Sequence, residues 1–305
     1  MSAPNARILA LLELVDEAPS AQELEPYLKS DDPEVRRTAL TVLSEAGDDW
    51  AEAAPYFAAA LTDPDDAVRR RAADLLRELR EVLRPGPEFI AHLQVAASSA
   101  DAGMRCAAIG ALWRHRLTSP ADLLRSLSDP DPRVRREVVL GFVSLDDLDG
   151  LAAAAGDPEP RIRIAAARGV GAVGDPRGIA TLVRMHDDSD HLVRAAALNA
   201  LSETGCTDDT VGLAVAGLSD AAWEVRQAAA TALIESMAEG AVEPLIAAAA
   251  DQNLDVRKAA VKALTPRLAE NPDVREALLR AQGDADADVR AFARIALEAE
   301  TGFPT

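Results

Sequence analysis

The chain has 305 residues, of which 51 are acidic and 32 are lysine or arginine, so its formal charge is −19. This balance argues against a protein that binds DNA mainly by neutralising phosphates, because that affinity needs a basic surface. It is compatible with a basic partner. Aromatic residues make up 3% of the chain, and the abundance of alanine favours packed helices over sheets. The length predicts two domains or one elongated repeat array.

The N-terminal segment, residues 1–19, holds a short apolar run that Glu13 and Asp16 interrupt. It lacks the pattern of a signal peptide, and no later run reaches the length of a membrane-spanning helix. The two cysteines, Cys106 and Cys206, are far apart and suggest small buried side chains in a reducing compartment. We therefore expect a capping helix at 1–19 and a cytoplasmic protein.

From residue 20 onward, one pattern recurs nine times: an aliphatic residue or Met, then Arg, usually Ala three positions later and usually Leu four beyond that. Successive arginines are 28 to 36 residues apart, which is typical of an internal structural repeat. The repeated arginines are Arg36, Arg69, Arg105, Arg135, Arg163, Arg194, Arg226, Arg257 and Arg290.

The spacing within the pattern predicts a helix, because residues four apart lie on one stripe. Four positions before the Arg stands an Asp, Asn or Glu in eight of nine cases; Asp and Asn are good N-caps, and Pro follows directly in several repeats. Another apolar stretch precedes each cap. Each repeat is therefore predicted to be a helix pair joined by an acidic turn, and a pair this small must stack on its neighbours to bury its apolar stripe.

The stretch GDPRGIATLVRMHDDSDHLVRAAALNALSETG, residues 174–205, resembles a HEAT repeat of the phycobilisome-lyase type, an armadillo-like helical repeat. The resemblance covers roughly residues 20–300. It implies an all-α fold, a right-handed α-α superhelix of about nine helix pairs, with residues 20–300 as a single solenoid and 301–305 as a tail.

Residues 169–174 read GVGAVG, the spacing of a dinucleotide-binding loop. That loop needs a strand before it and an acidic residue about twenty positions later, whereas here a helix is predicted upstream. Gly169 falls at a small-residue packing position of the repeat, and Gly174 matches Gly47 and Gly205 at predicted helix ends. We interpret the glycines as the end of a repeat.

Positions one, five and eight after the repeated Arg face away from the predicted core on a helical wheel. The resemblance implies that these positions line the concave groove of the superhelix. They hold seven basic and two acidic residues, and some apolar residues, a composition that indicates a binding surface. The candidate groove residues are Arg37, Arg70, Arg77, Trp113, Arg136, Leu140, Val143, Ile164, Arg168, Lys258 and Lys262. Solvation of an inner face remains an alternative, and Trp113 fits local packing equally well.

The acidic residues concentrate elsewhere, because the six positions before each repeated Arg hold 20 of the 51 acids in the chain. Stacked repeats would align these turns along one edge. In HEAT families, Asp–Arg contacts form a structural ladder between repeats, and the resemblance assigns the nine repeated arginines to such a ladder. The excess of acids along this edge could attract a basic partner.

No catalytic, cofactor-binding or metal-binding motif stands out in the sequence. We therefore expect a non-catalytic, monomeric scaffold or adaptor that binds a protein or peptide by its groove or acidic edge, without cofactor, membrane or nucleic acid. An inhibitor or immunity-type protein for a basic partner is the more specific form of this hypothesis. A HEAT-based enzyme, similar to a bilin lyase or a DNA glycosylase, is the alternative.

Overall fold

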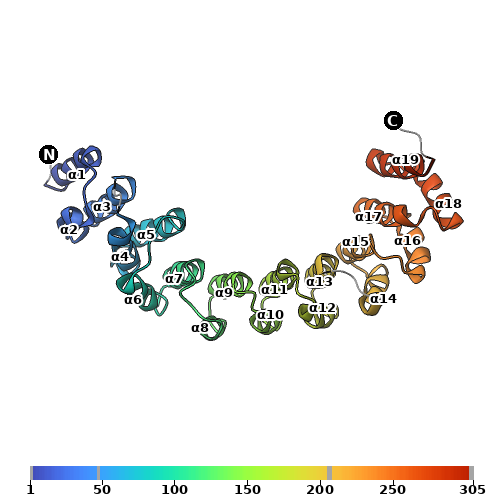
Figure 1. Ribbon diagram of the computed structural model, residues 1–305, viewed down its shortest axis with the longest axis horizontal. Coiled ribbons are helices and arrows are strands. Elements are labelled where there is room, and N and C mark those ends of the chain that lie inside the picture. The colour runs from blue at the N-terminus through green and yellow to red at the C-terminus, as the bar shows by residue number, and fades with distance from the viewer. Residues whose placement is uncertain (1–2, 47–48, 205–207, 302–305) are drawn as a thin grey trace. The chain divides into compact units, whose positions relative to one another are not determined.

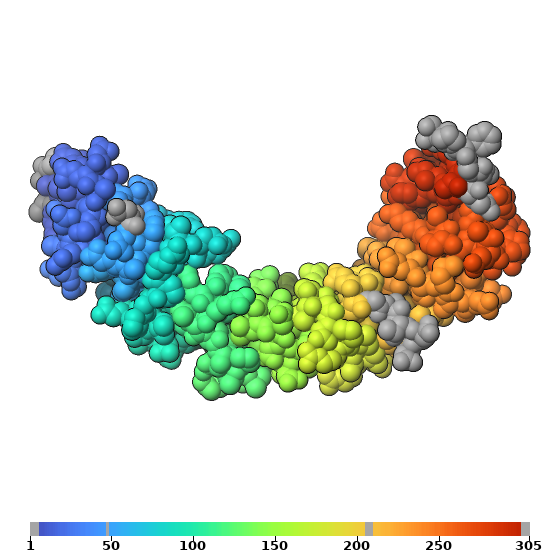
Figure 2. Space-filling model, viewed as in Figure 1, coloured from blue at the N-terminus to red at the C-terminus, as the bar shows by residue number. Residues whose placement is uncertain are grey.

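The computed structural model describes residues 3–46, 49–204 and 208–301, and all regular structure within these ranges is helical. The chain forms two compact units, Met1–Leu145 and Asp146–Thr305, which we call unit 1 and unit 2. In the space-filling view, the repeats within each unit follow one another in chain order (Figure 2). The predicted all-α solenoid of stacked helix pairs is confirmed.

Unit 1 begins with a single helix and continues with four helix pairs. The second helix of each pair carries one of the repeated arginines, and these second helices lie in one row beside the row of first helices (Figure 1). The helices are α1 (Ala3–Glu13), α2 (Ala21–Leu28), α3 (Pro33–Ala46), α4 (Trp50–Ala59), α5 (Asp66–Glu78), α6 (Pro87–Ala96), α7 (Ala102–Arg114), α8 (Pro120–Ser126) and α9 (Pro132–Ser144), with short 3₁₀ turns at Leu14–Glu17 and Ala60–Thr62.

Unit 2 repeats the arrangement with five helix pairs (Figure 1). They are α10 (Leu148–Ala154), α11 (Pro160–Val173), α12 (Ile179–Met185), α13 (His191–Thr204), α14 (Asp208–Gly217), α15 (Trp223–Ala232), α16 (Val242–Ala248), α17 (Leu254–Leu264), α18 (Pro272–Ala281) and α19 (Ala287–Thr301), with 3₁₀ turns at Pro176–Gly178, Glu239–Ala241 and Thr265–Arg267. The second helices are α11, α13, α15, α17 and α19.

Most second helices begin where the sequence predicts, at acidic or Asn caps; α15 begins after Ala222, and Glu159 before α11 makes no side-chain cap bond. In α5, the Asp65 carboxylate accepts hydrogen bonds from the backbone N–H groups of Ala67 and Val68 at 2.9 and 3.2 Å. Asp101 caps α7 in the same way although no proline follows it. Such caps satisfy backbone donors that the helix leaves without partners.

The apolar stripe of the repeated pattern forms the core of both units. The positions one before, three after and seven after each repeated Arg are at most 8% exposed in all nine repeats. In α13 these residues are Val193, Ala197 and Leu201, each with an exposed fraction of 0%. Burial of this stripe between neighbouring pairs provides the main stabilisation of the stack.

The interpretation of the GVGAVG stretch as a helix end is confirmed. The first five of its residues belong to α11, and Gly174 ends that helix in the left-handed conformation with φ +68°. An added Cβ at Gly171 would lie 3.1 Å from Ala200 Cα of α13, so this glycine allows a close approach of two second helices. The triplet therefore serves packing and helix termination.

In unit 2, a buried arginine links the C-terminal ends of two neighbouring second helices. Arg267 is 3% exposed, and its guanidinium donates to the carbonyl oxygens of Ala263, Leu233 and Ser236, at the C-terminal ends of α17 and α15. Burial lowers the pKa of Arg267. The carbonyl ends of two helices carry partial negative charge that stabilises this cation.

Candidate functional site

The repeated arginines all bind the turn of their own repeat. In each of the nine, Nη1 donates to the carbonyl oxygen six positions earlier, at 2.7 to 3.0 Å, and to the next carbonyl oxygen. These two bonds fix the guanidinium across the turn. Its Nε and Nη2 edge takes no part in these two bonds, and within each unit this edge can reach the next repeat.

Among the described residues, this edge is seen to hold an Asp carboxylate of the next turn by two hydrogen bonds of 2.6 to 3.1 Å in six pairs, and we call each such pair a rung. The Asp also accepts the N–H two residues later in its own turn, as Asp129 does from Asp131 at 2.9 Å. The six rungs are Arg36–Asp63, Arg105–Asp129, Arg163–Asp188, Arg194–Asp220, Arg226–Asp251 and Arg257–Asp284. Bidentate pairs of this kind are strong and directional.

The rungs change the acidity of their carboxylates. A hydrogen bond from Arg194 lowers the pKa of Asp220, and Arg226 does the same to Asp251. Because the ionised form is the one held in the rung, these carboxylates stabilise the fold at neutral pH.

No rung forms between the second and third repeats of unit 1, because Ser99 stands at the position of the rung Asp. Ser99 Oγ still accepts the N–H of Asp101 at 3.1 Å, but it offers no carboxylate to Arg69. Arg69 Nη2 instead lies 3.4 Å from Asp66 and 3.5 Å from Asp101. Arg69 Nε is buried without a hydrogen-bond partner in the described structure.

On the second helices of unit 1, the candidate groove arginines Arg37, Arg70 and Arg77 are exposed. Each forms an ion pair with an acid of its own helix, at 3.5 Å to Glu34, 2.6 Å to Asp66 and 3.0 Å to Asp74, respectively. Such exposed pairs bind weakly and exchange readily. The three arginines therefore remain accessible to a competing acidic group.

Trp113 is half-buried between α7 and α9. Its Nε1–H donates to Glu137 at 3.0 Å, and the Arg114 guanidinium lies 4.4 Å from the ring centroid. Arg114 also pairs with Glu137 at 2.9 Å, and Gly110 makes room for that pair, because an added Cβ would meet both side chains. These contacts give Trp113 a packing role within unit 1; a contact with a partner stays a prediction.

The second helix α9 carries an exposed arginine of a different kind on this face. Arg136 is exposed and makes no ion pair with any described residue. Leu140 and Val143, four and seven residues later, are half-buried and lie on the same side of the helix. A cation and two apolar side chains thus share one exposed strip.

In unit 2, α11 presents a similar strip, with exposed Arg168 four residues after half-buried Ile164. Arg168 forms no ion pair within residues 146–204 and 208–301. The two lysines of α17 are already engaged: Lys258 pairs with Asp288 at 2.8 Å, and Lys262 Nζ lies 4.3 Å from the Phe292 ring centroid. The binding potential on this row of unit 2 therefore rests mainly on Arg168.

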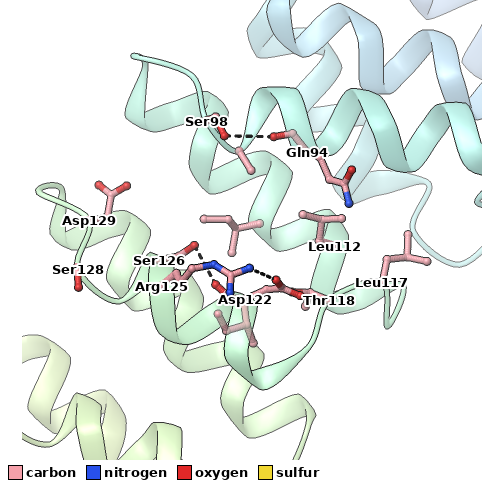
Figure 3. Close-up of a pocket in the computed structure, with 13 residues that line it drawn as sticks. Gln94, Ser98, Leu112, Leu117, Thr118, Asp122, Arg125, Ser126, Ser128 and Asp129 are labelled. Atoms are coloured by element: carbon pink, nitrogen blue, oxygen red, sulfur yellow. Dashed lines mark hydrogen bonds and ion pairs between the residues drawn. The ribbon is translucent and has the colours of Figure 1, made fainter.

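A recess of about 550 Å³ opens between the first helices α6 and α8 of unit 1 (Figure 3). Leu112 and Leu123 lie among its apolar lining, whereas its rim is polar and includes an Asp122–Arg125 ion pair (Figure 3). The repeat pattern gave no sign of this recess. The small side chains at the C-terminal ends of both helices, such as Ser98 and Ser126, were the available signal.

Sequence reasoning also missed Trp223, the first residue of α15, which is 38% exposed. It stands three positions before the repeated Arg, outside the positions assigned to the groove. The available signal was its type, because an indole occupies a helix start where the other repeats place Pro, Asp, Ala, His or Leu.

The described chain shows few of the features of an active site. No group of three His, Cys, Asp or Glu side chains among the described residues is arranged to hold a metal ion. Burial raises the pKa of the Cys106 thiol to about 11, so this cysteine is protonated at neutral pH and is a poor nucleophile. Among the described helices, none is both long and apolar enough to span a membrane.

Comparisons with known proteins agree with this architecture. The HEAT repeat family matches residues 3–77, 21–113, 126–202, 148–233 and 211–298, whereas no curated protein matches the chain at a significant level. Among solved structures, an engineered protein aligns over 100% of this chain and 97% of its own, with 19% identity and a TM-score of 0.55.

Two larger proteins share the fold over part of their length. Kap95p, in a structure with RanGDP, aligns over 97% of this chain and 48% of its own, with 15% identity and a TM-score of 0.68. A Kap121p mutant aligns over 94% of this chain and 37% of its own, with 14% identity and a TM-score of 0.62. The chain thus spans less than half the length of these two proteins. Repeated helix pairs, buried stripes and family matches over most of its length together show that the chain belongs to the HEAT-repeat family.

Proposed function

We propose that this protein is a non-catalytic scaffold that binds protein segments along the second helices of each unit. One observation carries the proposal: in a chain of charge −19, the exposed candidate groove positions of these helices are mainly basic and include Arg136 and Arg168, which no described acid neutralises. A partner segment that offers carboxylates and apolar side chains fits this surface. The fold shared with Kap95p, which binds RanGDP, agrees with a protein-binding role.

The candidate groove residues divide into two kinds within this proposal. Arg136 and Arg168 are free to bind a partner, together with the apolar residues beside them. Arg37, Arg70 and Arg77 would exchange their local ion pairs for partner carboxylates, which costs little because exposed pairs contribute at most about 1 kcal/mol. We assign Lys258 and Lys262 of α17 a supporting role, because both already contact other side chains.

The wider assignments rest on the sequence. We propose that residues 20–300 act as a single solenoid after a capping segment at 1–19, and that the protein is a cytoplasmic monomer without a cofactor. An inhibitor of a basic protein, bound along the acidic edge, is the more specific form of the function. The edge supports it through the excess of carboxylates in the turns.

The test is capture of partners from the native cell lysate on the immobilised protein, with quantitative mass spectrometry. The informative variants are R136E and R168E, singly and together. The controls are R125E and R177E, which make the same charge change at exposed arginines of α8 and of the turn before α12. A partner lost with R136E or R168E and kept by both controls supports the proposal. Equal retention by all four variants contradicts it, as does a partner lost only with the controls.

A further inference from the structure

Two large apolar side chains are exposed at the first turns of neighbouring second helices in unit 2. Trp223 at the start of α15 is 38% exposed, and Leu192 at the start of α13 is 44% exposed. The helices α13 and α15 pack side by side. An exposed indole is a candidate anchor for a partner protein, because Trp is enriched among the residues that carry most of the binding energy at interfaces.

The repeat geometry shows what surrounds the indole. His191 stands three positions before its repeated Arg, and Glu224 stands two positions before the next one; His191 Nε2 and Glu224 Oε1 are 3.8 Å apart. Trp223 and Asp255 occupy these same two positions one repeat later. By the same repeat geometry, we expect the Asp255 carboxylate to lie on the side of the indole that faces α17, whereas Glu224 faces His191 of α13.

The local charges leave this place negative. The nearby arginines of the turns, Arg226 and Arg257, are held in rungs by Asp251 and Asp284. Lys258 is held by the acids of the following turn, at 3.7 Å to Asp286 and 2.8 Å to Asp288. Asp255 is exposed and has no ion-pair partner among the described residues.

We propose that Trp223, Glu224 and Asp255 form a binding site for a lysine or arginine side chain of a partner protein. The aliphatic stem and cationic head of such a side chain would stack on the indole face, because the ring quadrupole attracts cations. The Asp255 carboxylate would neutralise the charge by a charge-assisted hydrogen bond, and Glu224, on the α13 side, would add longer-range attraction. This site is separate from the row of Arg136 and Arg168 and prefers the opposite charge.

The test follows the indole N–H signal of Trp223 by ¹⁵N–¹H NMR on the full chain. The probe is acetyl-tetralysine amide, and the matched uncharged probe is the same peptide with every side chain acetylated. W223F identifies the signal and keeps an aromatic face. We expect the lysine peptide to shift the Trp223 signal saturably and the acetylated peptide to leave it in place.

Two variants assign the contributions. W223L keeps apolar bulk without a π face and should weaken lysine-peptide binding about two- to fivefold; D255N should weaken it to a similar extent. Binding by the variants is followed through backbone amide shifts at the start of α15. D273N, at an exposed acid in the first turn of the first helix α18, makes the same charge change and should leave binding unaltered.

A Trp223 signal that does not move, or that moves equally with both peptides, overturns the proposal. Equal weakening by D255N and D273N also overturns it, since that result means attraction to overall charge alone. Backbone spectra of W223L that match the wild type establish that the fold is intact; if that variant unfolds, unchanged lysine binding in D255N still refutes the site. These outcomes are independent of the R136E and R168E experiment, so failure here leaves the proposed groove function standing.

Discussion

Replacing Ser99 with Asp should complete the rung that unit 1 lacks. In the six complete rungs, one carboxylate oxygen accepts a turn N–H and both oxygens accept from the preceding arginine. Ser99 already makes the turn contact, with its Oγ 3.1 Å from the Asp101 nitrogen, and Arg69 Nη1 is already fixed by the carbonyls of Asp63 and Pro64, both at 3.0 Å. The substitution therefore supplies the one missing group to a prearranged guanidinium.

The size of the effect follows from the contacts. A hydrogen bond to a charged group contributes about 1.5–3 kcal/mol, a range that already includes the gain from pairing a buried donor such as Arg69 Nε. Repulsion from Asp66 and Asp101, which already lie near Arg69 Nη2 at 3.4 and 3.5 Å, offsets up to about 1 kcal/mol. We expect S99D to raise the free energy of unfolding by about 1–2 kcal/mol. Each kcal/mol corresponds to a rise of about 2–4 °C in the melting midpoint.

The assay is urea unfolding followed by circular dichroism, with hydrogen exchange read at α5 and α7 because repeat arrays open by segments. S98D adds the same charge at the exposed neighbouring residue and should change stability by less than about 0.5 kcal/mol. In an R69M background, S99D should lose its benefit. Equal effects of S98D and S99D, or a benefit that persists in R69M, would refute the rung account.

Three further predictions concern the core, the buried cation and pH. L201A, at a fully buried position, should destabilise the fold by about 2–5 kcal/mol in urea unfolding; a loss below about 1 kcal/mol would contradict its place in the core. R267M should cost about 2–4 kcal/mol by the same assay, because it leaves buried carbonyls without donors, and a neutral result would show that solvent satisfies them. The pKa of Asp220 lies below its unfolded value of about 3.9, so its stabilisation is complete above about pH 4 and disappears as pH falls through the folded value. D220N should therefore lose more stability relative to wild type at pH 7 than at pH 3; equal losses at both pH values would count against the rung.

The sequence predicted the fold in detail because the repeat states it nine times. Each copy carries the same stripe, the same cap and the same Arg, so local periodicity determines the second helices; Val193, Ala197 and Leu201 are buried as that pattern requires. The same repeat pattern argued against a dinucleotide-binding loop at residues 169–174, and in the structure Gly174 ends a helix.

The candidate site was less accessible to sequence reasoning because it depends on what surrounds each residue. A helical wheel places Arg77 and Arg136 on the same face, but only the structure shows that Asp74 pairs with Arg77 while no described acid pairs with Arg136. Trp113 was ambiguous until Glu137 and Arg114 were seen beside it. The recess between α6 and α8 and the exposure of Trp223 arise from spacing between helices, which the repeat pattern leaves unspecified.

The central claim is that the second helices of each unit form the binding surface, and hydrogen exchange with a captured partner tests it most directly. Within unit 1, bound partner should slow exchange in α9 around Arg136 and leave α8 unchanged; within unit 2, it should slow exchange in α11 around Arg168 and leave α12 unchanged. Protection confined to α8 and α12, with α9 and α11 exchanging as in the free protein, would contradict the claim.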